Sequence, residues 1–118
     1  LIQGIPGQLT KASMDGILVD APCSGSGTWG RNPEEGYFFK AVSIADFADR
    51  QRKICRTAQK ILKPGGQLIY MTCSVFTAEN EAIVESLCAE GLVLREQHLL
   101  QPKYDAGDTL FIAILQKQ

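Results

Sequence analysis

Two short apolar segments, each followed directly by a cysteine-containing loop, constrain the fold of this chain more than any other feature. The first, GILVD at 16–20, leads into Ala-Pro-Cys23, and the second, QLIYM at 67–71, leads into Thr-Cys73-Ser. Each segment is nearly continuous in its apolar character, which is typical of a strand buried on both faces of a parallel sheet. The sequence therefore predicts two parallel strands over 16–20 and 67–71.

A helix is expected between these strands, because parallel neighbours need a crossover connection. Ser43 is suited to cap a helix, Asp46 follows three residues later, and apolar residues then recur at helical spacing as far as Leu62. The sequence Lys-Pro-Gly-Gly at 63–66 ends this pattern. The sequence predicts a helix over 43–62.

The rest of the chain predicts one more helix and two more strands. The helix is expected to begin after Thr77 and to end near Gly91, with acidic residues, Glu79 among them, placed favourably for its N-terminal dipole. Strands are expected over 92–94 and 109–115, paired antiparallel at the edge of the sheet. The order strand, helix, strand, helix, strand, strand is that of the second half of an α/β sheet fold.

Composition is that of one folded domain. The chain has 118 residues, of which 45% are hydrophobic and 21% charged, and this excludes a disordered or low-complexity chain. No stretch approaches the roughly 20 apolar residues of a membrane span. We therefore expect a soluble, cytoplasmic protein with no membrane partner.

The net charge of −1 means that any contact with nucleic acid must come from a local patch. The predicted first helix carries a basic row at three- and four-residue spacing: Arg52, Arg56, Lys60 and Lys63. This row is either a phosphate-binding surface or the solvated outer face of a helix that covers a sheet, and the second interpretation is favoured two to one on general grounds.

The four cysteines are Cys23, Cys55, Cys73 and Cys88, and their spacing contains no C-x-x-C pair. This argues against the usual zinc and thioredoxin sites. We therefore expect the thiols to be free and no metal to be bound. Cys55 and Cys88 fall inside helical patterns, where a free cysteine is usually a small core residue.

Asp20, Cys23 and Cys73 are expected at the carboxyl ends of neighbouring strands, where open α/β sheets bind their ligands. A carboxylate and two thiols at one edge would support covalent catalysis by a thiolate. The alternative is that Asp20 caps the loop amides and both thiols are passive. The small residues of 24–28 likewise either let backbone amides approach a phosphate or a base, or only serve a tight turn.

The segments Asp-Ala-Pro-Cys-Ser-Gly-Ser-Gly at 20–27, Leu-Lys-Pro-Gly-Gly at 62–66 and Tyr-Met-Thr-Cys-Ser at 70–74 resemble the later motifs of the Sun/Fmu-type RNA cytosine-5 methyltransferases. Gln51 and the run Glu-Asn-Glu at 79–81 fit the same pattern. The resemblance runs from about Asp15 to the C-terminus, and two cysteine motifs in this order and at this separation are highly specific.

The resemblance implies methylation of carbon 5 of cytosine in RNA, with S-adenosylmethionine as methyl donor, through a covalent cysteine adduct. It implies that Cys73 is the nucleophile, that Cys23 assists release of the methylated base, and that Asp20 lies beside the cofactor and the cytosine edge. It further implies that residues flanking the cysteines contact the substrate: Pro22, Ser24, Thr72, Ser74 and Arg31. Ribosomal RNA is the first substrate expected and transfer RNA the second.

The family also implies a glycine-rich loop and an acidic residue that hold the cofactor, and neither is found before the first predicted strand. We therefore expect residues 1–118 to be the C-terminal half of a Rossmann-like S-adenosylmethionine-dependent catalytic domain, inactive without the other half. The alternative is a short non-catalytic module that binds RNA or protein. The half-sheet would have an unpaired inner edge, which invites self-association or binding to a partner.

Overall fold

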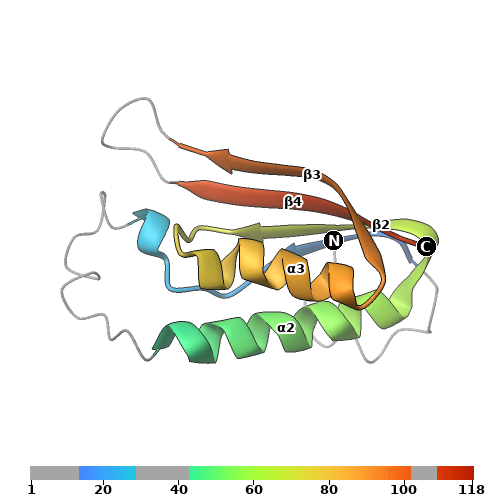
Figure 1. The fold of residues 1–118 in the computed structure, drawn as a ribbon, viewed down its shortest axis with the longest axis horizontal. Helices are drawn as coiled ribbons and strands as arrows, with labels where there is room; N and C mark the ends of the chain where they lie inside the picture. Colours follow the sequence, from blue (N-terminus) through green and yellow to red (C-terminus); the bar gives the residue numbers. More distant parts are fainter. Residues whose placement is uncertain (1–13, 29–42, 102–108) are drawn as a thin grey trace.

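A computed structural model describes residues 14–28, 43–101 and 109–118 of the chain (Figure 1). One sheet contains four strands: β1 (Met14–Asp20), β2 (Leu62–Thr72), β3 (Leu92–Leu100) and β4 (Leu110–Lys117). Two α-helices, α2 (Ser43–Ile61) and α3 (Glu81–Ala89), and two 3₁₀ turns, η2 (Ser26–Thr28) and η3 (Thr77–Glu79), complete the described elements. Within these ranges, no helix is long and apolar enough to cross a membrane.

The parallel pairing of the two cysteine-bearing segments is confirmed. β1 and β2 are parallel neighbours, with Asp20 opposite Met71. The ladder continues one step further, because the backbone N–H of Ala21 donates a 2.9 Å hydrogen bond to the carbonyl oxygen of Met71. Both strands therefore end at the same edge of the sheet, and both cysteine loops begin there.

The antiparallel pair at the edge of the sheet is also confirmed. The strand order is β1-β2-β4-β3, and β4 is antiparallel to both of its neighbours. β3 extends to Leu100, six residues beyond the predicted strand, although its residues from Leu94 onward are exposed. Its backbone pairs along the whole of β4, so ladder hydrogen bonds rather than apolar alternation define its length.

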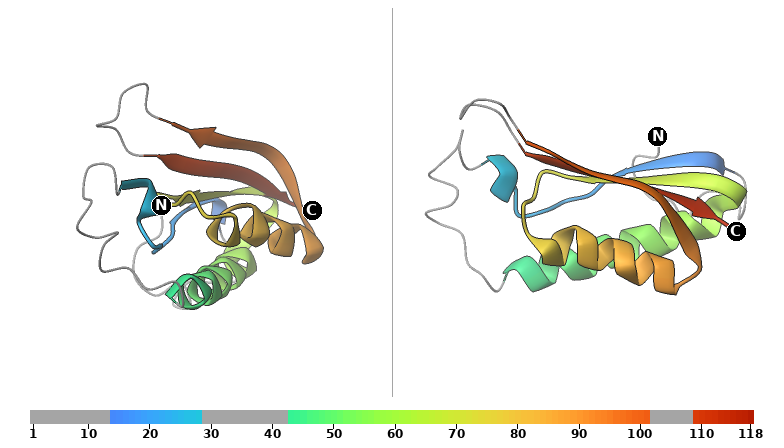
Figure 2. Two further views of the ribbon diagram at one scale, coloured as in Figure 1. Left: turned by 60° about the vertical axis from the view of Figure 1, so that its left-hand side comes forward. Right: turned by 45° about the horizontal axis from the view of Figure 1, so that its top comes forward.

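Both described helices lie on one face of the sheet, with α3 beside α2 (Figure 2). The buried side of α2 includes Ala48, Cys55 and Ala58, and that of α3 includes Ile83 and Leu87. These side chains join one core with apolar residues of the strands. The α/β fold class is confirmed, with the helices and the sheet as two layers.

The starts of β2 and α3 also differ from the prediction, whereas the bounds of β1, α2 and β4 differ from it by one or two residues. β2 begins at Leu62 rather than at residue 67, because Leu62 already pairs with Met14 before the register of β1 and β2 shifts. Gly65 adopts a positive φ of 84° at this irregularity, a conformation that a glycine accepts without strain. The second helix begins at Glu81, because residues 77–79 form the η3 turn instead of the first helical turn.

Candidate active site

The loops that follow β1 and β2 lie side by side at one end of the sheet (Figure 1). The backbone N–H of Gly27 donates a 2.8 Å hydrogen bond to the carbonyl oxygen of Cys73, and the Gly27 carbonyl oxygen accepts one of 2.9 Å from the N–H of Thr109. The loop after β1 is thereby tied both to the loop after β2 and to the residue that precedes β4.

Two glycines of the first loop have structural reasons to be there. A Cβ atom at Gly27 would lie 2.5 Å from the carbonyl oxygen of Thr109 and 2.8 Å from that of Cys73. Gly25 has a φ of 73°, in the left-handed region that favours glycine. At these two positions the tight-turn interpretation explains the residue without a ligand.

Cys23 and Cys73 are half-buried thiols that form no disulfide, one in each loop. Burial raises the pKa of the Cys23 thiol, and the negative charges of Glu79 and Asp20 raise it further. Hydrogen bonding to the backbone at Gly25 and Cys73 opposes this and lowers the pKa of Cys23. Since the net shift is upward, the environment of Cys23 favours the neutral thiol.

The other two cysteines lie elsewhere. Cys55 is fully buried in α2, where burial raises the pKa of its thiol to about 12, and Cys88 is exposed on α3. Among residues 14–28, 43–101 and 109–118, no group of three or more His, Cys, Asp or Glu side chains could hold a metal ion.

A buried carboxylate links the two cysteine loops. Glu79 is 0% exposed, and its Oε2 accepts a 2.8 Å hydrogen bond from the backbone N–H of Ser24. Its Oε1 accepts a 2.8 Å hydrogen bond from the hydroxyl of Ser74. One carboxylate therefore holds the residue after Cys23 and the residue after Cys73.

α2 contributes a fully buried amide to the same cluster. Gln51 donates from Nε2 to the carbonyl oxygen of Pro22 at 2.9 Å and to Oε2 of Glu79 at 3.1 Å. Its Oε1 is buried and accepts no hydrogen bond from the described residues. The helix that covers the sheet thus fixes the first loop at Pro22 and the carboxylate at the same time.

The two polar residues on either side of Cys73 are buried in this network. Thr72 donates from Oγ1 to Oδ1 of Asn80 at 2.6 Å, and Asn80 donates from Nδ2 to the carbonyl oxygen of Ser74 at 2.8 Å. The Ser74 hydroxyl also accepts from the N–H of Phe76 at 3.0 Å. These side chains shape the turn that presents Cys73.

The structure brings most of the predicted site residues to one edge of the sheet. Asp20 and Pro22 are exposed there, Ser24 is half-buried, and Thr72 and Ser74 are fully buried. Arg31 lies outside the described residues. The substrate contacts predicted for these side chains stay predictions.

Glu79 is the site residue whose place the sequence interpretation missed. It was expected at the start of the helix, where it would be favourable to the helix dipole, whereas the structure buries it before the helix and turns it toward both loops. The sequence signal that could have located it is its position five residues after Ser74 of the Thr-Cys-Ser segment and directly before Asn80.

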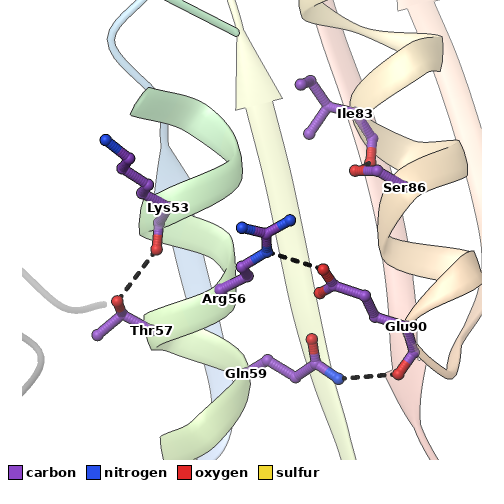
Figure 3. A network of polar contacts seen from close by, with 7 residues as sticks. All are labelled: Lys53, Arg56, Thr57, Gln59, Ile83, Ser86 and Glu90. Carbon is purple, nitrogen blue, oxygen red and sulfur yellow. Dashed lines mark hydrogen bonds and ion pairs between the residues drawn. The ribbon is translucent and has the colours of Figure 1, made fainter. Parts of the chain in front are cut away.

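The basic row of α2 is largely paired with acidic partners. Arg56 Nε lies 2.8 Å from Oε1 of Glu90, the residue that follows α3. Gln59 donates from Nε2 to the Glu90 carbonyl oxygen at 3.5 Å (Figure 3). Arg52 pairs with Asp49, and Lys63, which the structure places in β2, pairs with Asp15. These pairs fit the solvated outer face that was the favoured interpretation.

A hollow of about 350 Å³ lies beside this contact, lined by Arg56, Gln59, Lys60, Glu90 and Lys117. It is at the end of α2 that runs into β2, whereas the cysteine loops lie at the opposite end of the sheet (Figure 1). This hollow is therefore separate from Cys23 and Cys73.

Solved structures define the class of the protein. The chain is similar to NSun6 from Pyrococcus horikoshii, crystallised with SFG, with a TM-score of 0.75 and 29% identity over 85% of this chain and 29% of that one. It is also similar to a methyltransferase homolog protein from the same organism, with a TM-score of 0.76 and 26% identity over 91% of this chain and 40% of that one. The fold is that of part of a Rossmann-like methyltransferase domain.

The family follows from the sequence comparison. Residues 3–103 match the family described as 16S rRNA methyltransferase RsmB/F, and the chain belongs to this family. The resemblance drawn from the cysteine motifs is thereby confirmed.

Two curated relatives illustrate the match. Ribosomal RNA small subunit methyltransferase B of Proteus mirabilis is 33% identical over 106 residues, which cover 88% of this chain and 25% of the relative. Ribosomal RNA small subunit methyltransferase F of Serratia proteamaculans is 39% identical over 83 residues, which cover 70% of this chain and 17% of the relative. The chain thus spans a quarter or less of the length of these two relatives.

Proposed function

We propose that this chain supplies the two catalytic cysteine loops of a longer, S-adenosylmethionine-dependent enzyme that methylates carbon 5 of cytosine in ribosomal RNA. The observation that carries the proposal is the juxtaposition of two half-buried thiols, Cys23 and Cys73, on loops hydrogen-bonded to each other at one edge of the sheet. Membership of the RsmB/F family supports ribosomal RNA as the substrate, ahead of transfer RNA. The curated relatives are bacterial, so the cytoplasm is where we propose the enzyme acts.

Asp20 is the described residue that suits S-adenosylmethionine. It is exposed at the carboxyl end of β1, and its carboxylate makes no hydrogen bond or ion pair with other described residues. A carboxylate accepts hydrogen bonds from amino and hydroxyl groups, both of which the cofactor carries. When bound, the cofactor supplies the methyl group. Asp20 would lie beside the cofactor and the cytosine edge and accept hydrogen bonds from them.

Cys73 is the nucleophile in this proposal. Its thiolate adds to carbon 6 of cytosine, which makes carbon 5 electron-rich enough to accept a methyl group. Transfer of the methyl group would leave S-adenosylhomocysteine. The carbon 5 proton would then pass to a base, and the electrons of that C–H bond would re-form the double bond between carbons 5 and 6. The bond between sulfur and carbon 6 would break in the same step and restore the Cys73 thiolate.

Cys23 is assigned to the release of the product. The hydrogen bond between its thiol and the backbone of Cys73 supports this role, because Cys23 would then lie beside an adduct formed on Cys73. Pro22, Ser24 and Arg31 are proposed to contact the RNA from the first loop and its continuation. Thr72 and Ser74 are proposed to act on the substrate through the shape of the Cys73 turn.

The experiment is a methylation assay on the full-length protein. It is incubated with S-adenosylmethionine carrying a labelled methyl group and with unmodified small-subunit ribosomal RNA, and the RNA is digested to nucleosides for mass spectrometry. The expected product is labelled 5-methylcytidine. Label on another atom or base would overturn the cytosine-5 assignment, and no label from a folded, cofactor-binding protein would overturn the proposed substrate.

A further inference from the structure

Glu79 occupies a position between the two cysteine loops that the chemistry above does not use. Its carboxylate is fully buried and accepts one hydrogen bond from each loop, from the N–H of Ser24 and from the hydroxyl of Ser74, both at 2.8 Å. A third hydrogen bond, of 3.1 Å, comes from Gln51 of α2. The two loops therefore meet at a single carboxylate.

The backbone at Glu79 is itself held firmly. The hydroxyl of Tyr70, a fully buried residue of β2, donates a 2.6 Å hydrogen bond to the Glu79 carbonyl oxygen. The next residue, Asn80, is 1% exposed and bonds to Thr72 and to the backbone of Ser74. The carboxylate thus projects from a segment anchored to the centre of the sheet.

A buried carboxylate destabilises the folded state unless it accepts hydrogen bonds, because burial removes it from water. An amide of the same shape would keep an acceptor for Ser24 but would present an NH₂ group toward Ser74, whose hydroxyl now donates. The charge and the acceptor geometry of Glu79 therefore match this arrangement of the two loops in particular.

We infer that Glu79 is a positioning residue for methyl transfer, which sets the Cys23 loop against the Cys73 loop so that both thiols reach the same cytosine. This inference rests on the proposed function, since it concerns the alignment of the two proposed catalytic thiols. Glu79 acts through Ser24 and Ser74 and does not itself touch the substrate.

The first test compares Glu79→Gln with Glu85→Gln in the full-length protein. Glu85 is an exposed residue of α3 and serves as the matched control for loss of one carboxylate close by in sequence. We expect Glu79→Gln to lower kcat by on the order of 100-fold, because misplacement of reacting groups by about 1 Å has effects of that size. KM for RNA should change little, and the control should keep wild-type kinetics.

The second test separates positioning from general loss of structure, by alkylating the thiols over a range of pH and locating the modified residues by mass spectrometry. The groups that face Cys23 are Glu79, Asp20 and the backbone at Gly25 and Cys73. In Glu79→Gln the loss of negative charge should move the alkylation profile of Cys23 to lower pH. Cys55, buried in α2, should stay as protected as in the wild type.

The outcomes are distinct. The inference is overturned if Glu79→Gln keeps the wild-type kcat or if the alkylation profile of Cys23 does not change. It is also overturned if Cys23 and Cys55 are alkylated equally and the loss of activity matches the unfolded fraction of the variant. If Glu79→Gln fails to fold, Ser74→Ala breaks the Oε1 contact together with the hydrogen bonds of the same hydroxyl to Ser26 and Phe76, while the Glu79 charge stays. A lower kcat with Cys55 still protected is then expected, and a wild-type kcat in this variant overturns the inference. If the wild type methylates no cytosine, the proposed function fails, while the Cys23 profile still decides whether Glu79 holds the first loop.

Discussion

The hydroxyl of Tyr70 donates a 2.6 Å hydrogen bond to the backbone carbonyl oxygen of Glu79. Both residues are 0% exposed, so this bond joins the end of β2 to the backbone of the residue whose carboxylate lies between the cysteine loops, without help from solvent. Burial raises the pKa of Tyr70, and the negative environment raises it further, so the phenol remains a hydrogen-bond donor under ordinary conditions.

Tyr70→Phe is expected to destabilise the protein by about 1–2 kcal/mol, because it leaves a buried carbonyl oxygen without its partner while keeping the ring. The ring contacts Phe111 edge to face with centroids 6.4 Å apart, and this contact should survive the substitution. Chemical denaturation of both proteins measures the difference. An unchanged free energy of unfolding would show that the hydrogen bond contributes nothing.

Gly27→Ala is expected to destabilise the protein by about 1–3 kcal/mol, because an added methyl group cannot fit between two backbone carbonyl oxygens without moving a loop. Gly16→Ala in β1 is the matched control, since a Cβ there would meet its nearest neighbour at an ordinary 3.8 Å. Thermal melting compares the two. Equal melting temperatures would contradict the packing of the two loops described above.

Cys73→Ala is expected to abolish methylation in the full-length enzyme, because no other group can form the bond to carbon 6 in the proposed mechanism. Cys88→Ala, at an exposed position of α3, is the control and should keep full activity. The measurement is transfer of a labelled methyl group to RNA. Turnover retained by Cys73→Ala would refute its role as the nucleophile.

Cys23→Ala is expected to trap the reaction after the Cys73 adduct has formed, because the residue proposed to assist release is missing. A covalent complex of protein and RNA should then accumulate as a slowly migrating band on a denaturing gel. The double variant Cys23→Ala, Cys73→Ala should lack the band. Normal turnover without any adduct in Cys23→Ala would count against the release role.

Cys55 is expected to make stability depend on pH at the alkaline end. Burial raises its pKa from the ordinary 9.0 to about 12, so the fold favours the neutral thiol. A raised folded-state pKa contributes stability that is complete below pH 9 and is lost as the pH rises toward about 12. The difference in melting temperature between wild type and Cys55→Ala should therefore shrink over this range. A constant difference would contradict the pKa shift.

The elements carried by local patterns were predicted well. The apolar runs before Cys23 and Cys73 predicted β1 and β2 and their parallel pairing, and the helical spacing after Ser43 predicted α2. The length of β3 was wrong, because its exposed residues pair through backbone groups that leave no apolar pattern in the sequence. The predicted start of α3 was wrong, because the η3 turn occupies the residues before Glu81.

By itself the sequence determined that two cysteine loops end neighbouring parallel strands, since hydrophobic runs and turn residues are local properties of the chain. Only the tertiary structure decided that Glu79 is buried between those loops. Its partner Ser24 is 55 residues away, and the hydrogen bond depends on the register of β1 with β2 and on the placement of the η3 turn. A contact of that kind follows from the relative positions of packed elements, which periodicity within any one of them does not specify.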